Sequence, residues 1–321
     1  MNQTSPASSA NWAPPRVIAI MGPTACGKSS VAEAICRQRP CEIVSVDSAL
    51  VYRGMDIGTA KPSPAIRQEI PHHLIDVLDP EQSFSAAEFA NAALRAIAQI
   101  HSRGNVPLLV GGTMLYFRAL LEGLAPLPAA SESVRARLVE ETATLGLEAL
   151  HRRLAEVDPV SAQRIHKNDP QRIQRALEVY EVTGRPLSDA WREAERYVFP
   201  YPLTRIVLWL PDRAKLHRRI AQRLDDMFAA GFVDEVARLR GRPGLTADMP
   251  SMRAVGYRQV WEYLAAETDS ETMRQRALFA TRQLAKRQMT WLRQVHNARW
   301  IEADSEQIVE YVLKILDAAP C

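Results

Sequence analysis

The sequence predicts an α/β protein built around a parallel sheet, with an inserted all-helical subdomain and a helical C-terminal region. Three observations predict this class. Short apolar runs alternate with helical stretches in the first third of the chain, and a glycine-rich turn follows the first run. The strand pattern then stops for about 65 residues and resumes, which is typical of an insertion. Alternating strands and helices indicate a layered core with a parallel sheet.

The first predicted strand, Val17–Met21, consists of five apolar residues, as expected for a strand buried on both faces. A helix follows from about Ser29, and residues 43–46 form a second apolar strand. Ser85 and Glu88 have the spacing of a capping box, which predicts the start of a further helix. That helix ends at Gly104, and residues 106–110 form the next strand.

The middle of the chain has no strand pattern and contains several helical stretches. The clearest of them begins at Asp169-Pro170, a good cap and first-turn pair, and ends at Gly184. A strand returns at 205–210, and the chain beyond Asp212 has a mainly helical pattern. We therefore expect a disordered tail (1–16), an α/β core (17–130 and 198–320) and a helical insertion (131–197).

Length and composition exclude several classes. At about 150 residues per domain, 321 residues allow two domains. Hydrophobic residues make up 47% and charged residues 24%, as in a folded globular chain. No apolar run approaches the roughly 18 residues of a membrane-spanning helix. The N-terminus lacks the pattern of a signal peptide, and the four cysteines lack zinc-ligand spacing. We expect a cytoplasmic monomer.

A phosphate-binding loop lies between the first strand and the first helix. Residues 22–29 fit the pattern G-x-x-x-x-G-K-[ST]. In such a loop, backbone N–H groups at a helix N-terminus surround phosphate oxygens. The lysine adds a positive charge, and the hydroxyl can ligate Mg²⁺. The pattern predicts binding of a polyphosphate or pyrophosphate without identifying it. The candidate ligands are Gly22, Pro23, Thr24, Ala25, Cys26, Gly27, Lys28 and Ser29, the last also for Mg²⁺.

Two polar residues follow other predicted strands. Asp47 ends the second strand, and Thr113 follows Gly111-Gly112 after the strand at 106–110. Ligands of open α/β sheets bind beyond the carboxyl ends of the strands. Asp47 can hold Mg²⁺, act as a general base or cap the following turn. Thr113 can bind a substrate or cap a helix. The adjacent pair His72-His73 makes a poor metal site, so we expect a structural role for it.

The net charge of +3 conceals clusters of basic residues. Residues 272–300 contain seven Lys or Arg and no Asp or Glu, and we expect a helix from Met273 to about Trp291. Arg282, Lys286 and Arg293 lie broadly on one face of that helix. Two further clusters lie at 253–258 and 171–175. Basic clusters with interspersed aromatic residues are typical of nucleic-acid binding.

Together these segments resemble the bacterial tRNA dimethylallyltransferase (tRNA isopentenyltransferase) family, from Val17 to about Arg293. The stretch at 47–62 is the most specific match. Cys26 stands where the family commonly has Ser, and Ser29 where it commonly has Thr. The matching stretches are 22–29, 47–62, 71–76, 111–116, 169–180, 253–259 and 286–293.

The resemblance implies a P-loop NTPase-like three-layer core and a reaction. A dimethylallyl group would pass from dimethylallyl diphosphate to N6 of the adenosine that follows the tRNA anticodon (position 37), with release of diphosphate and with Mg²⁺ as cofactor. Asp47 matches the family's general base. Thr113 and Arg223 match catalytic positions near the reacting groups, Arg223 by the weaker alignment.

The resemblance also implies which residues contact the tRNA anticodon stem-loop, with the insertion as an arm that closes on it. The implied contacts are Asp47, Ser48, Ala49, Leu50, Thr113, Arg135, Gln171, Arg172, Ile173, Gln174, Arg175, Arg253, Ala254, Val255, Gly256, Tyr257, Arg258, Lys286, Arg287, Gln288, Met289, Thr290, Trp291, Leu292 and Arg293.

Three other functions share part of this pattern. A small-molecule kinase would have the loop and Asp47, but it would need ATP and has no use for the basic clusters. A non-catalytic RNA-binding or nucleotide-switch protein would form no modified product, and its tRNA binding would survive Asp47→Ala. A relative that prenylates free adenine nucleotides would be inhibited by AMP.

Overall fold

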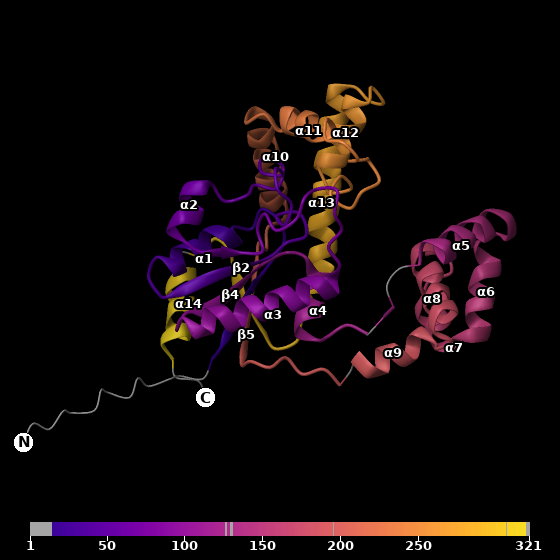
Figure 1. Cartoon of the computed structure of the whole chain (residues 1–321). Coiled ribbons are helices and arrows are strands. Elements are labelled where there is room, and N and C mark those ends of the chain that lie inside the picture. The colour runs from indigo at the N-terminus through magenta and orange to yellow at the C-terminus, as the bar shows by residue number, and fades with distance from the viewer. Residues whose placement is uncertain (1–14, 126, 129–130, 195, 306, 319–321) are drawn as a thin grey trace, which may run out of the picture. The chain divides into compact units, whose positions relative to one another are not determined.

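The computed structural model describes residues 15–125, 127–128, 131–194, 196–305 and 307–318 (Figure 1). The tail expected at 1–16 lies almost entirely outside these residues. Its last residue, Arg16, is described and donates a hydrogen bond of 3.0 Å to the carbonyl oxygen of Ile315. The chain divides into two compact units, one of residues 1–120 and 200–321 and the other of residues 121–199. The sequence predicted these boundaries near 131 and 198.

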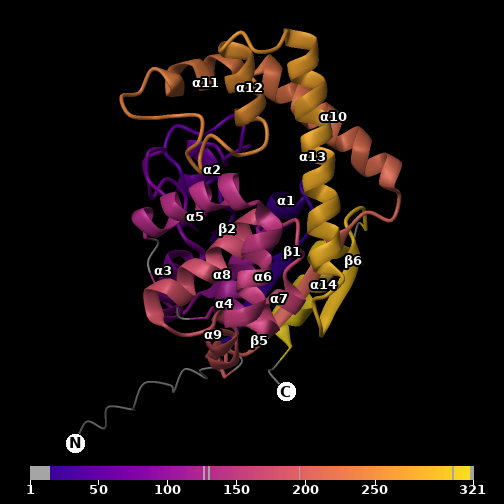
Figure 2. The same cartoon turned by 90° about the vertical axis from the view of Figure 1, so that its right-hand side faces the viewer.

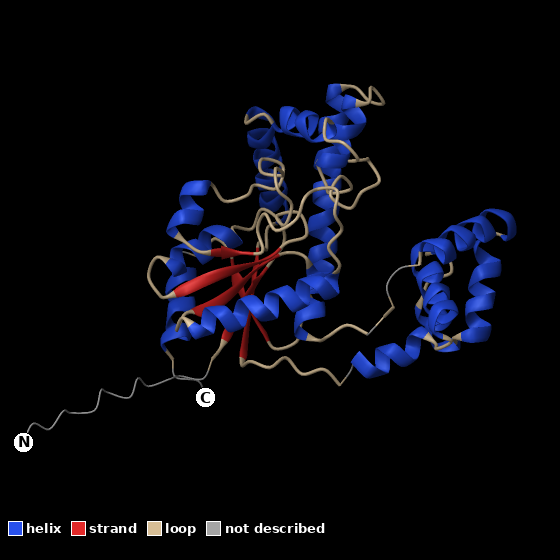
Figure 3. Ribbon diagram, in the orientation of Figure 1, coloured by secondary structure: helices blue, strands red, loops and turns tan. Residues whose placement is uncertain are grey.

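Six strands of the described chain form one sheet in the order β3-β2-β4-β1-β5-β6 (Figure 3). All neighbouring strands are parallel. The four predicted strands are present at its centre, so the prediction of a parallel α/β sheet is confirmed. The strands are β1 (Val17–Met21), β2 (Cys41–Val46), β3 (His72–His73), β4 (Val106–Gly111), β5 (Leu203–Trp209) and β6 (Ala298–Glu302).

The two outer strands were not predicted. β3 contains only His72 and His73, which pair with β2. Both imidazoles form hydrogen bonds with neighbouring groups: His72 Nδ1 lies 2.7 Å from the carbonyl oxygen of Ile70, and His73 Nε2 lies 2.7 Å from Glu42 Oε2. β6 lies in the part of the chain whose pattern is mainly helical, and it pairs with β5.

Helices cover the sheet and extend above its carboxyl edge (Figures 1 and 2). The predicted capping box is present in α3, because Ser85 Oγ accepts a hydrogen bond from Glu88 N and Glu88 Oε2 accepts one from Ser85 N. The helices of this unit are α1 (Lys28–Cys36), α2 (Pro64–Glu69), α3 (Ala86–Ser102), α4 (Met114–Leu121), α10 (Arg213–Ala229), α11 (Phe232–Arg240), α12 (Tyr257–Leu264), α13 (Ser270–Leu292) and α14 (Ile308–Asp317).

Two large apolar clusters contribute to holding this unit together. In the first, α1 and α14 share buried side chains with the central strands, among them Ile18, Ile206 and Val312. The second lies above the carboxyl edge, where α10–α13 pack around Phe232 and Tyr257. This second cluster also buries Val51, Tyr52 and Met55, so the segment after Asp47 is part of the core. None of the described helices is long and apolar enough to cross a bilayer.

The second unit consists of helices around a separate apolar cluster that includes Leu138, Leu154 and Leu177. The predicted caps of α8 are present: Asp169 Oδ1 accepts a hydrogen bond from Arg172 N, and Gly184 ends the helix with φ of 69°. The helices are α5 (Glu132–Leu145), α6 (Leu147–Val157), α7 (Pro159–Arg164), α8 (Pro170–Thr183) and α9 (Leu187–Ala194).

A buried carboxylate in β2 makes the stability of the sheet depend on pH. Glu42 accepts hydrogen bonds of 2.8 and 2.7 Å from Arg103, and it also accepts hydrogen bonds from His73 and Asn105. These contacts, with Arg103 first, together lower the pKa of Glu42 from 4.5 to about 2, against the effect of burial. Because the pKa is lowered on folding, this contribution is complete above pH 4.5 and is lost as the pH falls toward about 2.

We therefore expect Glu42→Gln to unfold at a lower temperature than the wild type at pH 7, and the difference to vanish below about pH 2 to 3. Thermal unfolding of both proteins between pH 7 and pH 2 measures this difference. A difference that stays constant over the whole range would contradict the role of the Glu42 charge.

Candidate active site

The carboxyl ends of three central strands bring the predicted site residues together. In the sheet register, Gly111 of β4 lies opposite both Met21 of β1 and Val46 of β2. The phosphate loop follows Met21, and Asp47 follows Val46. The segment Gly112-Thr113 follows Gly111 between them. These three segments therefore share one edge of the sheet, where open α/β folds bind their ligands.

The phosphate loop has the backbone of an anion-binding turn. Ala25 and Gly27 have positive φ values of 62° and 88°, and Gly27 lies at the N-cap of α1. Lys28 Nζ donates a hydrogen bond of 2.6 Å to the carbonyl oxygen of Pro23, so the ammonium group lies against the backbone of the loop. Gly22 leaves no space for a side chain, since a Cβ there would lie 2.5 Å from the carbonyl oxygen of Leu208.

A glutamine of α13 links the phosphate loop to the residue that follows β4. Gln288 Oε1 accepts a hydrogen bond of 2.8 Å from Thr24 N, and its Nε2 donates one of 2.9 Å to the carbonyl oxygen of Gly112. The side chain is 9% exposed. Gln288 was predicted as an RNA contact from the resemblance, and its bridging position was missed. The available signal is its spacing from Ala285 and Leu292, which places it on the buried face of α13.

Asp47 and Thr113 form a connected group at the end of β2. Asp47 Oδ1 accepts hydrogen bonds from Ala49 N (2.8 Å) and Leu50 N (3.3 Å), so the capping role considered for Asp47 is present. Nothing in the described part of the chain donates to its other oxygen. Thr113 Oγ1 accepts a hydrogen bond of 3.1 Å from Ser48 N. One carboxylate oxygen is therefore fixed by the backbone, and the other is available.

Arg223 reaches this edge from α10. Its Nη2 donates a hydrogen bond of 3.2 Å to the carbonyl oxygen of Thr59. Burial lowers the pKa of Arg223, while Asp47 and Cys26 act to raise it. The guanidinium forms no ion pair with any described carboxylate, and with Thr24 and Ala25 it lines a small pocket. A partly buried, permanently charged arginine without a carboxylate partner suits a bound anion.

A buried carboxylate that the sequence analysis missed holds the segment after Asp47. Glu235 of α11 accepts hydrogen bonds from the backbone N–H groups of Asp56 (3.0 Å), Ile57 (2.7 Å) and Gly58 (3.2 Å). The hydroxyl of Tyr257 donates a fourth, of 2.6 Å. The signal for Glu235 was its position on the buried face of α11, between Phe232 and Leu239.

The predicted RNA contacts on this unit differ in exposure. Lys286, Arg287 and Arg293 are exposed. Arg253 and Arg258 are exposed too, and Arg258 pairs with Glu262 at 2.9 Å. Fully or nearly fully buried are Gly256, Tyr257, Gln288 and Leu292, and partly buried are Ala254, Val255, Met289 and Trp291.

In the helical unit, one buried acid brings two predicted arginines together. Glu178 is 1% exposed and accepts hydrogen bonds from Arg135 Nε (3.0 Å) and Arg175 Nη1 (2.7 Å). Arg172 is largely exposed and lies 3.4 Å from Asp169. Ile173 is part of the apolar cluster of this unit. The structure therefore places Arg135 and Arg175 side by side and Ile173 away from the surface.

A phosphate loop, a carboxylate and a partly buried arginine at the carboxyl edge of a parallel sheet are features of a P-loop-type α/β protein. A family model described as IPP transferase matches residues 50–295. The chain belongs to this family, whose curated members include the tRNA dimethylallyltransferases.

Curated relatives and solved structures agree with this assignment. The chain is 60% identical to the tRNA dimethylallyltransferase of Alkalilimnicola ehrlichii over 279 residues, which cover 87% of this chain and 88% of that protein. It is 56% identical to that of Thioalkalivibrio sulfidiphilus over 308 residues (95% and 96%). The tRNA isopentenylpyrophosphate transferase of Bacillus halodurans matches with a TM-score of 0.69 and 36% identity (94% and 95%). A eukaryotic dimethylallyltransferase acting on tRNA matches with 0.77 and 26% (94% and 78%).

Proposed function

We propose that this chain transfers a dimethylallyl group from dimethylallyl diphosphate to N6 of adenosine 37 of tRNA, and that it acts as a monomer in the cytoplasm. The proposal rests on family membership and on one observation in particular. Arg223 is a partly buried cation without an ion-pair partner in the described chain, and it lies beside both the phosphate loop and Asp47. This arrangement suits a diphosphate that leaves next to a carboxylate.

The phosphate loop acts on the leaving group. As the bond between the allylic carbon and the diphosphate oxygen breaks, negative charge accumulates on the departing oxygens. The N–H groups at the start of α1, Lys28 and Arg223 are positioned to stabilise that charge. Donors that are already in place cost little reorganisation during the reaction, which makes them effective catalysts.

The residues at the loop fit a magnesium ion. Mg²⁺ prefers hard oxygen ligands and commonly combines one or two carboxylates with substrate phosphates and water. Ser29 offers an exposed hydroxyl in the first turn of α1, and the diphosphate would supply the charged oxygen ligands. Among the described residues no group of three His, Cys, Asp or Glu forms a site made of protein ligands alone. Bound at Ser29, Mg²⁺ would neutralise charge on the diphosphate.

Asp47 acts on the acceptor. The N6 amine of adenine is a weak nucleophile because its lone pair is delocalised into the ring. A carboxylate that accepts the N6 proton as the new bond forms removes this difficulty. The hydrogen bonds to Ala49 N and Leu50 N hold one oxygen of Asp47 and leave the other to accept the proton. Thr113, bonded to Ser48, supports the same turn.

The acceptor is the anticodon stem-loop. The target base must leave its stack to reach Asp47, as in other enzymes that modify bases. The exposed cations of α13 and of residues 253–258 bind phosphates of the RNA. The helical unit acts as a second arm on the stem-loop through Arg135, Arg172 and Arg175.

A transfer assay tests the proposal directly. Purified protein, Mg²⁺, labelled dimethylallyl diphosphate and an anticodon stem-loop with adenosine at position 37 are mixed without ATP. Label in the RNA is the expected result, and a stem-loop with guanosine at position 37 should stay unlabelled. Phosphate transfer or hydrolysis that requires ATP would instead favour a kinase, and RNA binding without any product would favour a binding protein.

Arg287 on the exposed face of α13 should contribute to RNA binding rather than to chemistry. We expect Arg287→Glu to weaken binding of the stem-loop several-fold and to make the slope of log K against log salt shallower by roughly one. Fluorescence anisotropy over a range of salt concentrations measures both. Lys314→Glu, the same change of charge at an exposed position of α14, is the matched control. Equal effects of the two variants would contradict a specific contact at Arg287.

A further inference from the structure

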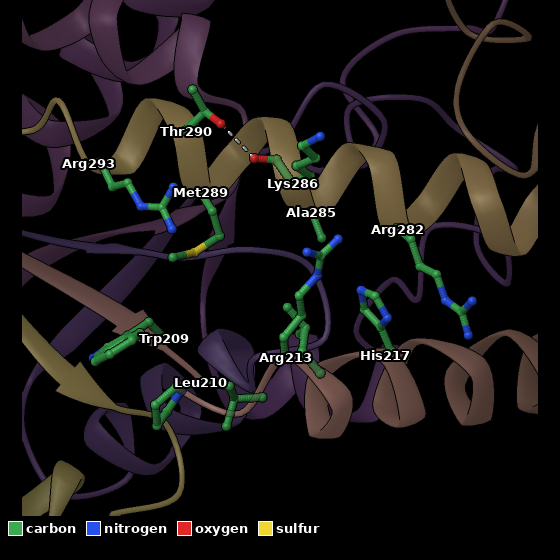
Figure 4. A pocket seen from close by; sticks show the side chains of 12 residues that line it. Trp209, Leu210, Arg213, His217, Arg282, Ala285, Lys286, Met289, Thr290 and Arg293 are labelled. Carbon is green, nitrogen blue, oxygen red and sulfur yellow. Dashed lines mark hydrogen bonds between the residues drawn. The ribbon is translucent and has the colours of Figure 1, made fainter.

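A second pocket opens between α10 and α13, beside the end of β5, with a volume of about 240 Å³. Five basic side chains from the two helices line it (Figure 4): Arg213, His217, Arg282, Lys286 and Arg293. Figure 4 shows Arg213 and His217 extending from α10 toward α13, and Arg282 extending from α13 toward α10. None of the residues that line the pocket is acidic.

The positive charge of this pocket is not neutralised by the described part of the protein. Arg213, Arg282, Lys286 and Arg293 form no ion pair there, whereas nearby Lys215 binds Asp304 at 2.6 Å. The Nε of Arg282 is buried without a hydrogen-bond partner. Burial, with the charges of Arg282 and Arg213, lowers the pKa of His217. A group of cations that repel one another in this way is suited to a bound anion.

The length of the basic row excludes a single small diphosphate as the ligand of all these groups. From Arg282 to Arg293, α13 rises by about 16 Å. A diphosphate contacts only part of such a row, whereas successive phosphates of a polynucleotide can follow it. One wall of the pocket is apolar and contains Leu210, Met289 and Trp209. Trp209 is held edge-to-face against Trp300, with ring centroids 5.9 Å apart. An aromatic wall beside a row of cations suits an unpaired nucleotide.

The pocket lies next to the candidate active site at the carboxyl edge of the sheet, but it is a separate site. Leu210 and Ala285 belong to an apolar cluster against which Ala25 of the phosphate loop packs. β5 lies three strand positions from β2, or about 14 Å at the usual strand spacing. A base bound at Trp209 is therefore not the base that reaches Asp47.

We propose that this pocket is an RNA subsite for a nucleotide that flanks the modified adenosine. Arg213, Arg282 and Lys286 bind phosphates of the RNA, and the base of the flanking nucleotide packs against Trp209. The inference rests on the proposed function, and it adds Arg213, His217, Arg282 and Trp209 to the residues that select the substrate.

The test measures RNA binding by the full-length protein without the diphosphate donor. A labelled anticodon stem-loop is titrated with the Arg213→Gln/Arg282→Gln variant over a range of salt concentrations. Loss of two phosphate contacts should weaken binding roughly ten-fold at low salt and make the salt slope shallower by about 1.4. The KM for dimethylallyl diphosphate should change less than two-fold. Arg276→Gln on the same helix, where Arg276 already pairs with Glu262 at 3.5 Å, should leave RNA binding unchanged.

Single variants show whether a loss of RNA binding by the double variant comes from misfolding. Arg213 is exposed at the start of α10, so Arg213→Gln should fold normally and show about half of the change in slope. Trp209→Leu should weaken binding about ten-fold, and Trp209→Phe should retain most of it. Unchanged RNA affinity in these variants, or an equal loss in Arg276→Gln, would overturn the proposal. So would a higher KM for the donor with normal RNA binding, which would indicate a small-diphosphate site.

The two proposals can fail separately. If the wild type binds the stem-loop through these residues but transfers no label to it, the proposed function fails and the subsite remains. If the wild type transfers the label and the pocket variants bind RNA normally, only the subsite fails. Wild-type protein that binds no RNA would overturn the subsite as well.

Discussion

Asp47→Asn is expected to slow transfer of the dimethylallyl group by roughly 10²–10⁴-fold, the usual contribution of a general base. The amide oxygen of asparagine can still accept the hydrogen bonds from Ala49 N and Leu50 N, so the turn is preserved. The change removes the negative charge and the basicity of the side chain. Binding of the stem-loop should therefore stay within a few-fold of the wild type. Single-turnover transfer with saturating donor and RNA measures the chemical step, and anisotropy measures binding.

Two further variants separate chemistry from structure. Asp56→Asn changes an exposed carboxylate of the same segment, which pairs with Lys61, and should keep transfer within a few-fold. Asp47→Ala also removes the acceptor of the turn and should lose some RNA affinity in addition to the rate. If Asp47→Asn transfers at the wild-type rate, Asp47 is not the base. If it loses binding and transfer to the same extent, its role lies in holding the substrate.

The central part of the fold was predictable because its signals are local. β1, β2, β4 and β5 contain short apolar runs, the first three of which are followed by a glycine or an aspartate, and α3 carries its capping box in four consecutive residues. β6 has no such signal, since Arg299 and Trp300 leave it without an apolar run. It is a strand because it pairs with β5, about ninety residues earlier in the chain. Two-residue β3 depends in the same way on β2.

The residues of the candidate site also differ in whether a local sequence signal predicts them. The phosphate loop is contiguous in sequence, and Asp47 and Thr113 follow from the ends of predicted strands. Gln288 contacts Thr24 across 264 positions, and Arg223 contacts Thr59 across 164. Nothing local in α10 or α13 specifies these pairs. Only the resemblance to a family pointed to Arg223, and the bridging contacts of Gln288 became visible only in the structure.

Glu235 is such a long-range partner, and its replacement should have the largest effect on stability. Glu235→Ala leaves three backbone N–H groups and the Tyr257 hydroxyl without their acceptor in a site that is 3% exposed. Each unsatisfied buried donor costs about 1–3 kcal/mol, and partial relaxation limits the sum to roughly 4 kcal/mol. For a unit of this size, that lowers the unfolding temperature by roughly 10 °C.

Transfer should fall together with stability, because the segment held by Glu235 continues directly from Asp47. Glu235→Gln keeps one acceptor oxygen and should lie between the wild type and Glu235→Ala in both measurements. Asp234→Ala removes the neighbouring exposed carboxylate of α11 and should change the free energy of unfolding by no more than about 0.5 kcal/mol. Calorimetry and the transfer assay on the same samples measure both effects. A Glu235→Ala protein that unfolds within 2 °C of the wild type would show that the segment after Asp47 is held chiefly by its packing against Phe232 and Tyr257, the rings that any side chain at Gly58 would strike.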